Sequence, residues 1–579
     1  MFTKKKSVLL FLLPGLCMLM VFYIVPFIGG IGYSLTDGSY KNEFVGLQNY
    51  RDLWQNPMFR LGLTNTMQLS LICAPLLWVL SFILAAGLMN VRPFGGFFRS
   101  TALMPYLMPS SAMLLVWLVL FDYGGPINRA LVALGAQRVM WLESGALRVP
   151  IVLLFLWKNL GFCLIIFLSA LQSIPEPLYE YARLEGASFL YQTFRITLPL
   201  ITPSAFLVFV MAWINAFKIF KEVYFIAGAY PDASVYTLQH YMNNMYGKLN
   251  YQLVTTAAYT FGLIVFAIFA VLFFIQRRAA RGAQPGVRGG GYMKHSSPRA
   301  RHLLSRLVLS LLALVILLPV AMTAVYSFFS PAEIKAFMGT RGSYDASVFM
   351  QIKLAPSMFS LSQYYNILIE DMTILRYFVN SAMYAAAILL GQALVIPMMA
   401  YALSRFRFPG RDAIFFAVIM LMLLPFQVTM VPNVLTLRRM ALLDTVWAVI
   451  LPMTIAPFSI FLLRQYMVSL PGDMIEAAQI DGAGTWRCFI HVVLPVCRPV
   501  LGAAVALSFA DCWNLVEQPL TYLTTRTDLY PLSVVFNQLT EKSTGVEFAG
   551  AALYTLPALC IYLYFQADIL EGVQLTELK

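Results

Sequence analysis

The sequence predicts an all-α integral membrane protein with about 12 transmembrane helices in two homologous six-helix units. Composition is the first observation that predicts it: 60% of the 579 residues are hydrophobic and 12% are charged, with a mean hydropathy of +0.74. A soluble domain carries roughly 25% charged residues, so this chain requires a lipid bilayer around it. The second and third observations are the length of the apolar stretches and a polar segment that occurs once in each half. Soluble enzymes, secreted disulfide scaffolds and disordered chains are excluded.

Twelve stretches reach the length of about 20 mostly apolar residues that a spanning helix needs. The stretches of the first half lie near residues 8–34, 64–91, 100–121, 149–172, 199–224 and 254–276, and those of the second half lie near residues 303–329, 376–403, 412–436, 444–468, 499–523 and 548–567. The first stretch follows three lysines, as in a signal peptide, but it continues without a small-residue cleavage site. We therefore interpret it as a spanning helix.

Basic residues near the span ends predict the orientation. Most of them fall on one side, which we expect to be cytoplasmic together with both termini: Lys4, Lys5, Lys6, Arg92, Arg99, Arg277, Arg278, Arg281, Arg299, Arg301, Arg306, Arg405, Arg407 and Arg411. Arg438 and Arg439 fall on the opposite side and are an exception. The net charge of +13 is thus interpreted as contact with an anionic lipid surface and not with nucleic acid.

The chain divides into three regions. Residues 1–276 and 303–579 form the two transmembrane units, and residues 277–302, rich in Gly, Pro and Arg, are predicted to form a flexible cytoplasmic linker. Because Met293 could be a start codon, one fused polypeptide and two subunits written as one both remain open. The seven cysteines form no CxxC pair and the four histidines have no ligand spacing, so we expect reduced thiols and no metal site.

The internal repeat is the most informative feature of the sequence. In the first half EYARLEGA (180–187) is followed by FRITLPLITP (194–203), and in the second half EAAQIDGA (476–483) is followed by IHVVLPVCRP (490–499). The two copies match at a fixed offset of 296 positions, and both lie in the loop between the fourth and fifth spans of their half. The chain is therefore predicted to be a duplication.

Each copy of the loop has the composition of two short helices joined at a bend. In the second copy Ala477 and Ala478 favour a helix that begins near Glu476, and Gly482 permits a backbone turn that most residues adopt at a cost. Small residues with a carboxylate at the tip suit a groove on a soluble partner that offers an arginine. An amphipathic loop resting on lipid headgroups is the alternative, but two copies on one face favour a partner with two equivalent sites.

These residues resemble a known family. The EAA pattern, followed by DGA and a later LP, is similar to the coupling loop of ATP-binding-cassette importer permeases. The first copy departs from it, with Tyr181 for the second residue and Glu185 for the Asp. Matched to the motif, the coupling residues are Glu180, Ala182, Glu185, Gly186, Glu476, Ala477, Ala478, Asp481 and Gly482. Further stretches resemble the carbohydrate branch, of the maltose and multiple-sugar type: FVGLQNYRDL (44–53), WKNLGF (157–162), LSALQSIP (168–175), SLSQYYNIL (360–368), YALSRFRFPGR (401–411) and LLRQYMVSLP (462–471).

The resemblance implies a type I importer fold and a passive path driven by other proteins. Two copies of an ATPase subunit would bind the loops and consume ATP and Mg, and an extracytoplasmic solute-binding protein would deliver a carbohydrate. The location implied is a bacterial or archaeal cytoplasmic membrane. The chain itself contains no GxxxxGK[ST] phosphate loop, so we expect no ATPase activity, no other enzymatic activity and no bound cofactor.

Polar groups within spans are costly, so each is a candidate for the substrate path. The candidates are Trp213, Asn215, Asp511, Trp513 and Asn514, because aromatic rings stack on sugars and amides or carboxylates bind hydroxyls. The alternatives are helix-to-helix pairing for Asp511 and core packing or interface anchoring for the tryptophans. An ion pair between Lys218 and Glu222 is expected from their spacing, and Lys158 is expected to extend toward the membrane surface. Asp511 is the only clear carboxylate near the middle of a span, which disfavours an ion-coupled secondary transporter.

Overall fold

The computed structural model describes residues 2–38, 43–89, 91, 95–282, 299–338, 345, 349–350, 352–370, 372–423, 426–541 and 546–575. Over these residues the chain is helical, with one isolated bridge between Thr36 and Phe44 and no longer strand. The predicted all-α membrane fold is confirmed. Helices satisfy their own backbone hydrogen bonds, which is what a segment in hydrocarbon requires.

The described part of the first half contains fifteen α-helices. They are α1 (Phe2–Leu19), α2 (Val25–Ser34), α3 (Gln48–Gln55), α4 (Pro57–Leu88), α5 (Gly95–Leu107), α6 (Ser110–Leu120), α7 (Pro126–Ala133), α8 (Arg148–Gln172), α9 (Glu176–Leu184), α10 (Phe189–Gln192), α11 (Leu198–Leu200), α12 (Thr202–Phe217), α13 (Phe220–Ala227), α14 (Leu238–Gly247) and α15 (Tyr251–Gly282). π-Helical turns at Met20–Ile24 and Thr193–Thr197 join α1 to α2 and α10 to α11.

The described part of the second half also contains fifteen. They are α16 (Arg299–Tyr326), α17 (Pro331–Met338), α18 (Ser362–Tyr365), α19 (Thr373–Arg405), α20 (Arg411–Leu423), α21 (Phe426–Arg439), α22 (Val446–Met453), α23 (Pro457–Ser469), α24 (Asp473–Ile480), α25 (Thr485–Cys488), α26 (Leu494–Val496), α27 (Arg498–Trp513), α28 (Glu517–Tyr522), α29 (Leu532–Glu541) and α30 (Glu547–Leu575). π-Helical turns at Asn366–Glu370 and Phe489–Val493 follow α18 and α25.

Among the described residues nine helical stretches are long and apolar enough to cross a membrane, and two bent helix pairs raise the number to eleven. The bent pairs are α5 with α6, at 101°, and the run from Thr485 to Val496 with α27, at 76°. The remaining predicted span, 412–436, corresponds to α20 and α21, between which residues 424–425 lie outside the described residues. The linker is more helical at its ends than predicted: α15 extends to Gly282 and α16 begins at Arg299, and the residues between them lie outside the described part.

The duplication predicted from the sequence is present in the structure. Four successive elements of the two halves have the same bounds at an offset of 296 positions: α10 and α25, the π-helical turns at Thr193–Thr197 and Phe489–Val493, α11 and α26, and α12 and α27. The helices that precede them, α9 and α24, end at Leu184 and Ile480, again 296 positions apart. The sequence repeat therefore corresponds to a repeated structural unit.

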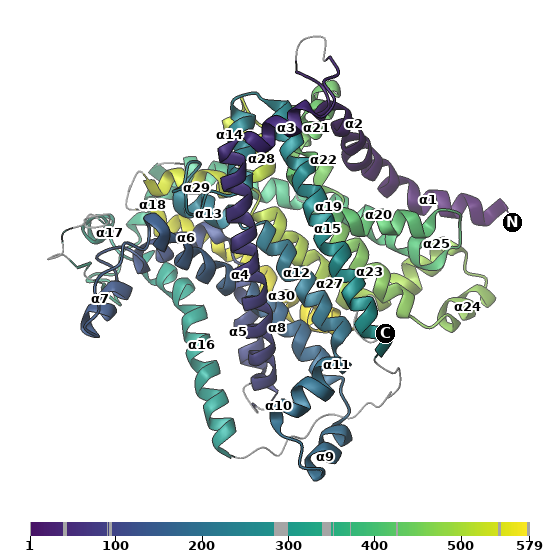
Figure 1. Cartoon of the computed structure of the whole chain (residues 1–579), viewed down its shortest axis with the longest axis horizontal. Coiled ribbons are helices and arrows are strands. Elements are labelled where there is room, and N and C mark those ends of the chain that lie inside the picture. The colour runs from purple at the N-terminus through teal and green to yellow at the C-terminus, as the bar shows by residue number, and fades with distance from the viewer. Residues whose placement is uncertain are drawn as a thin grey trace.

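The two halves pack against each other through their spanning helices. Helices α5 and α6 of the first half contact α16 and α30 of the second, α1 contacts α19, and α15 contacts α21. In Figure 1 the purple α1 and α2 lie on the right of the view beside green helices of the second half, and α2 contacts α21 there. Within the first half a glycine permits the closest helix approach: a Cβ on Gly161 would lie 1.8 Å from the carbonyl oxygen of Ala102 on α5.

Candidate coupling loops and translocation path

The two copies of the repeated loop have the same backbone geometry. Gly186 and Gly482 both have positive φ, 74° and 82°, which is a conformation that glycine adopts without the steric cost of a Cβ. The N–H of Ala187 donates to the carbonyl of Ala182 at 2.8 Å, and the N–H of Ala483 donates to that of Ala478 at 2.9 Å. This is the hydrogen-bonded termination of a helix by a left-handed residue. The glycine predicted to bend the loop therefore ends α9 and α24 and turns the chain into the next helix.

The carboxylates of the two loops are exposed. Glu180, Glu185, Glu476 and Asp481 all have exposed side chains, and within the described part of the chain none of them makes an ion pair or a side-chain hydrogen bond. In Figure 1, α9 lies at the lower edge of the molecule and α24 at its right edge, away from the packed helices. The predicted coupling residues therefore lie at two projecting tips whose polar groups are available to another molecule.

Apolar side chains are also exposed at the same positions in both loops. Leu184 is 84% exposed and its equivalent Ile480 is 86% exposed. Leu190 and Trp486 form a second equivalent exposed pair, and Phe194 and Ile490 form a third. Exposed apolar patches of this kind mark contact sites with proteins or membranes. The first loop adds Tyr181, Phe189 and Tyr191, where the second has Ala477, Thr485 and Arg487.

A buried ion pair joins three helices of the first half within the spans. The Nζ atom of Lys158 on α8 donates to Oε1 of Glu222 on α13 at 3.3 Å and to Oγ of Ser110 on α6 at 2.6 Å. The side chains of Lys158 and Glu222 are 17% and 6% exposed. The expected pair of Lys218 with Glu222 was therefore wrong, because residues on a separate helix lie closer to Glu222 than the residue one turn away. Lys158 extends into the protein and not toward the membrane surface.

Asn215 is half-buried and takes part in a second polar contact of the first half. Its Nδ2 donates to Oδ1 of Asn159 at 3.0 Å, and Asn159 is the residue next to Lys158 on α8. Trp213 is buried between Phe209 and Phe217, and its indole N–H has no hydrogen-bond partner in the described structure. An unpaired buried donor costs about 1–3 kcal/mol, so this N–H gains from any acceptor that reaches it.

Asp511 differs from its neighbours because its side chain is exposed, whereas Ala510 and Cys512 beside it are buried. Lys218, in the equivalent region of the first half, shows the same pattern between buried Phe217 and Ile219. Lys218 lies within electrostatic reach of Asp511 and of Glu517. Charged groups in spans face the bundle interior or water, not lipid. Both side chains are thus charged groups that are exposed within spans and lie near each other electrostatically.

Trp513 and Asn514 are engaged in contacts within the protein. Trp513 is 2% exposed, stacks on Phe509 and Tyr554, and donates from Nε1 to the carbonyl of Tyr554 at 3.0 Å. Oδ1 of Asn514 accepts a hydrogen bond from the backbone N–H of Ser110 at 3.2 Å. The structure thus gives both residues the packing and helix-pairing roles that the sequence left open as alternatives.

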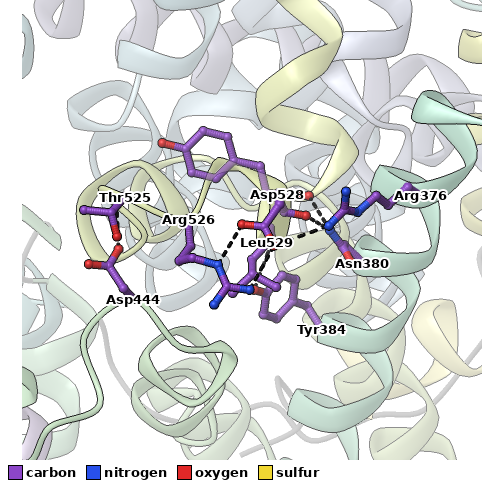
Figure 2. A network of polar contacts seen from close by, with 9 residues as sticks. Arg376, Asn380, Tyr384, Asp444, Thr525, Arg526, Asp528 and Leu529 are labelled. Atoms are coloured by element: carbon purple, nitrogen blue, oxygen red, sulfur yellow. Dashed lines mark hydrogen bonds and ion pairs between the residues drawn. The ribbon is translucent and has the colours of Figure 1, made fainter.

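Opposite the coupling loops, where the chain leaves α28, a short segment is held by charged contacts. Asp528 pairs with Arg526 at 2.8 Å and with Arg376 of α19 at 3.3 Å, and Asn380 donates to the carbonyls of Asp528 and Tyr530. Figure 2 shows Arg376 and Arg526 approaching Asp528 from different elements, with Asp444 bound to the same segment at Thr525. Hydrogen bonds from the guanidinium of Arg526, together with its positive charge, hold the pKa of Asp528 below its ordinary value.

Comparison with known proteins agrees with this architecture. Residues 54–284 and residues 393–567 each match the family described as binding-protein-dependent transport system inner membrane component. The two matches together cover more than half of the chain, which therefore belongs to this family of membrane transport components. The chain contains the permease domain twice.

Individual relatives each align with less than half of this chain. The diacetylchitobiose uptake system permease protein NgcG of Streptomyces coelicolor is 34% identical over 35% of this chain and 69% of its own length. The lactose transport system permease protein LacF of Rhizobium radiobacter is 29% identical over 47% of this chain and 93% of its own. The sn-glycerol-3-phosphate transport system permease protein UgpA of Yersinia pestis is 32% identical over 36% of this chain and 72% of its own length. One such relative thus corresponds to one half of this chain.

Sequence reasoning did not find the roles of Ser110, Lys158 and Lys218. A signal for Lys158 and Lys218 was present in the repeat. At the offset of 296 positions Lys158 and Glu222 correspond to Thr454 and Gln518, and Lys218 corresponds to Asn514. A charge in only one copy of a repeated membrane helix indicates a role that the two halves do not share.

Proposed function

We propose that this chain is the transmembrane permease of an ATP-driven importer that moves a carbohydrate across a bacterial or archaeal cytoplasmic membrane. Residues 1–276 and 303–579 act as its two permease units, with both termini and both repeated loops on the cytoplasmic side. Two copies of a separate ATPase subunit hydrolyse ATP with Mg, and an extracytoplasmic solute-binding protein supplies the substrate. The chain itself binds no cofactor in this scheme.

The observation that carries the proposal is the pair of matched, exposed loop tips. Both α9 and α24 are followed two residues later by a glycine with positive φ, both carry an exposed carboxylate at the equivalent positions Glu180 and Glu476, and both expose an aliphatic side chain before the turn. Two matching protrusions on one chain suit two copies of one partner. An arginine or lysine of the ATPase would pair with the carboxylate, while its groove would cover Leu184 or Ile480.

The mechanism follows from how the tips connect to the spans. Each tip continues through a short helix and a π-helical turn into α12 or α27, without an intervening flexible loop. A partner that closes and moves the two tips toward each other would therefore also move α12 and α27. Those helices carry Asn215 and Asp511, so closure of the ATPases would open or close the space between the halves.

The substrate class rests on the lining of that space and on the names of the relatives. Asp511, which is exposed, and Asn215, which is half-buried, offer acceptors and donors of the kind that hydroxyl groups bind. The relatives named for lactose and diacetylchitobiose support a sugar as the substrate. The relative named for sn-glycerol-3-phosphate indicates that some proteins of the family transport a phosphate ester. The segment around Asp528, opposite the coupling tips, is where the binding protein would dock.

Affinity purification of the tagged full chain in mild detergent, followed by mass spectrometry, tests the assembly. We expect an ATPase subunit at two copies per chain, and ATP-driven uptake of a sugar by vesicles that contain the complex and the binding protein. A chain that purifies alone and takes up sugar in response to a proton or sodium gradient would contradict the proposal.

Substitutions in the second tip test the coupling role. Glu476→Lys and Gly482→Asp should abolish uptake and leave the folded chain in the membrane. Gly482→Asn is the matched control for backbone strain, because asparagine tolerates positive φ better than most residues. Gly484→Ala is a control at a glycine with φ of −68°. Normal uptake by both Glu476→Lys and Gly482→Asp would rule out coupling through this tip.

A further inference from the structure

Two equivalent positions near the ends of α12 and α27 hold one amide and one charged side chain in each half. The amide comes first in the first half, and the charged residue comes first in the second. The offset of 296 positions pairs Asn215 with Asp511 and Lys218 with Asn514. The first half thus contributes a cation, Lys218, and the second half contributes an anion, Asp511. Since α12 and α27 are equivalent elements, these side chains project from corresponding ends of two related helices.

Both charges are exposed within spans, and they lie within electrostatic reach of each other. Each is exposed between buried neighbours inside a span, although a charged side chain in contact with hydrocarbon costs several kcal/mol. Asp511 also lies within electrostatic reach of Tyr106 on α5 of the first half. Tyr106 stacks on Phe162, which in turn packs against Phe458 of the second half. Asp511 therefore lies near a cluster to which both units contribute.

The six charged residues at and around Lys218 and in the nearby ion pair balance in number, three positive and three negative: Lys158, Lys218, Lys221, Glu222, Asp511 and Glu517. Lys158 and Glu222 neutralise each other in the buried ion pair. The next equivalent position beyond Lys218 and Asn514 holds Lys221 in the first half and Glu517 in the second, and both act electrostatically on Lys218. Lys218 with Lys221 therefore offsets Asp511 with Glu517. A substrate that carries net charge would meet a like charge with no surplus counter-charge to compensate it.

We propose that Lys218 and Asp511 select a substrate without net charge and with hydroxyl groups on opposite sides, a neutral oligosaccharide rather than a uronate, phosphate ester or amino sugar. This inference rests on the proposed function and narrows its substrate class. An ammonium group only donates hydrogen bonds and a carboxylate only accepts them, whereas a hydroxyl does both. A neutral sugar therefore satisfies Lys218 on one side and Asp511 on the other, and its desolvation is less costly than that of an ion.

The duplication supplies conservative test variants. Asp511→Asn introduces the residue that the first half has at the equivalent position, and Lys218→Asn introduces the residue of the second half. Neither adds bulk. Asp511→Asn leaves one excess positive charge and should favour an anionic sugar, and Lys218→Asn leaves one excess negative charge and should favour a cationic sugar. The double variant restores neutrality.

Binding of three β-1,4-linked trimers tests the inference: cellotriose, the glucuronate trimer and the glucosamine trimer. They share linkage and ring configuration. Each ring of the glucuronate trimer carries a carboxylate at C6, and each ring of the glucosamine trimer carries an ammonium group at C2, whereas cellotriose is neutral. The full chain with its ATPase subunits is placed in nanodiscs without the binding protein, so that only the permease discriminates. Affinities are measured by ligand-observed NMR at low salt and at about pH 6, where the uronates are ionised and the amines are protonated.

The wild-type chain should prefer cellotriose to either charged trimer by roughly tenfold or more, the effect of one partly screened charge. Asp511→Asn should reduce the preference for cellotriose over the glucuronate trimer about tenfold, and it should still exclude the glucosamine trimer. Lys218→Asn should do the reverse, and the double variant should return both ratios toward the wild-type values. A wild-type chain that binds a charged trimer as well as cellotriose, or ratios that neither single variant changes, would overturn the inference.

Uptake distinguishes this failure from a failure of the proposed function. If ATP-driven uptake of a sugar persists while the ratios stay unchanged, only the selection by charge is overturned. If none of the trimers binds to any variant and ATP drives no sugar uptake, the carbohydrate class itself is wrong and the inference is overturned with it.

Discussion

The backbone N–H of Ser110 donates a hydrogen bond to Oδ1 of Asn514, 3.2 Å away and 404 residues further along the chain. Ser110 is the first residue of α6, directly after the 101° bend from α5, and its N–H has no partner within its own helix. The side chain of Ser110 also accepts from Lys158. Two contacts therefore hold the bend between α5 and α6. One comes from Lys158 of the ion pair in the same half, and the other comes from Asn514 at the end of α27 in the second half.

Removing the Asn514 amide should weaken the junction between the halves. In Asn514→Ala the buried N–H of Ser110 is left without a partner, which costs about 1–3 kcal/mol. The thermal midpoint of the full chain in detergent, followed by tryptophan fluorescence, should fall. Asn514→Asp keeps an acceptor at the same place and serves as the control. An unchanged midpoint in Asn514→Ala would mean that water replaces the amide.

Replacing one partner of the Lys158–Glu222 ion pair should destabilise the chain more than replacing both partners. Lys158→Thr or Glu222→Gln alone leaves an uncompensated buried charge, for a loss of about 3–5 kcal/mol. The double variant carries the two residues that the second half has at these positions, Thr454 and Gln518, and should recover most of that loss. Thermal unfolding of the three variants measures the coupling. Additive losses in the double variant would show that the pair contributes nothing as a pair.

Exposed aliphatic residues at the loop tips should matter for assembly and not for folding. Leu184→Asp and Ile480→Asp change side chains that are 84% and 86% exposed, so the thermal midpoint should stay within the error of the measurement. Recovery of the ATPase subunit on affinity purification should fall at least fivefold, because the partner would have to bury a new carboxylate. Leu354, also 84% exposed but outside both loops, provides the control substitution Leu354→Asp. Equal recovery from all three variants would exclude a contact at the tips.

Water access to the space between the halves can be measured by cysteine labelling. In a background where the exposed Cys17 and Cys560 are replaced by serine, Asp511→Cys should react with a charged, water-soluble methanethiosulfonate. Ala510→Cys, at the buried neighbouring position, should react at least tenfold more slowly. Equal rates at both positions would place Asp511 on the lipid-facing surface, where a charged reagent does not enter.

The segment held by Asp528 should loosen in acid. Because Arg526 lowers the pKa of this carboxyl in the folded state, the contact stabilises the segment above the ordinary pKa and is lost as pH falls through the lowered value. Amide exchange at Leu529, Tyr530 and Leu532, corrected for the intrinsic rate, should rise between about pH 5 and pH 2. Asp528→Asn should exchange fast over the whole range. A wild-type chain that follows the variant at every pH would exclude this contact as the cause.

Much of the fold could be predicted because lipid imposes a strict rule on sequence. A span must be apolar over about 20 residues, so the spans could be located from the sequence, and the loops between them are polar. The bends were not predicted. Apolar length does not report direction, and the 101° turn between α5 and α6 depends on packing against α16 and α30 of the other half. The repeated loop could be predicted in detail, including the turn at Gly482, because a glycine followed by a small residue has a local conformational meaning.

The path residues show the limit of such reasoning. A spacing of four residues on one helix predicted that Lys218 pairs with Glu222, but Glu222 pairs with Lys158, 64 residues earlier in the chain. Trp513 and Asp511 were equal candidates in the sequence, and only packing separates them: the indole is enclosed by Phe509 and Tyr554, while the carboxylate is exposed.

The sequence by itself determined that this protein lies in a membrane, that it is a duplication of a six-helix unit and that each copy carries a loop with an exposed acidic tip. These properties are local or periodic, and each is a consequence of composition, length or a repeated motif. Tertiary structure alone decided which polar side chains neutralise each other and which remain available between the halves. That depends on distances between helices far apart in the chain, because the free energy of a charge in a membrane is set by what surrounds it and not by its neighbours in sequence.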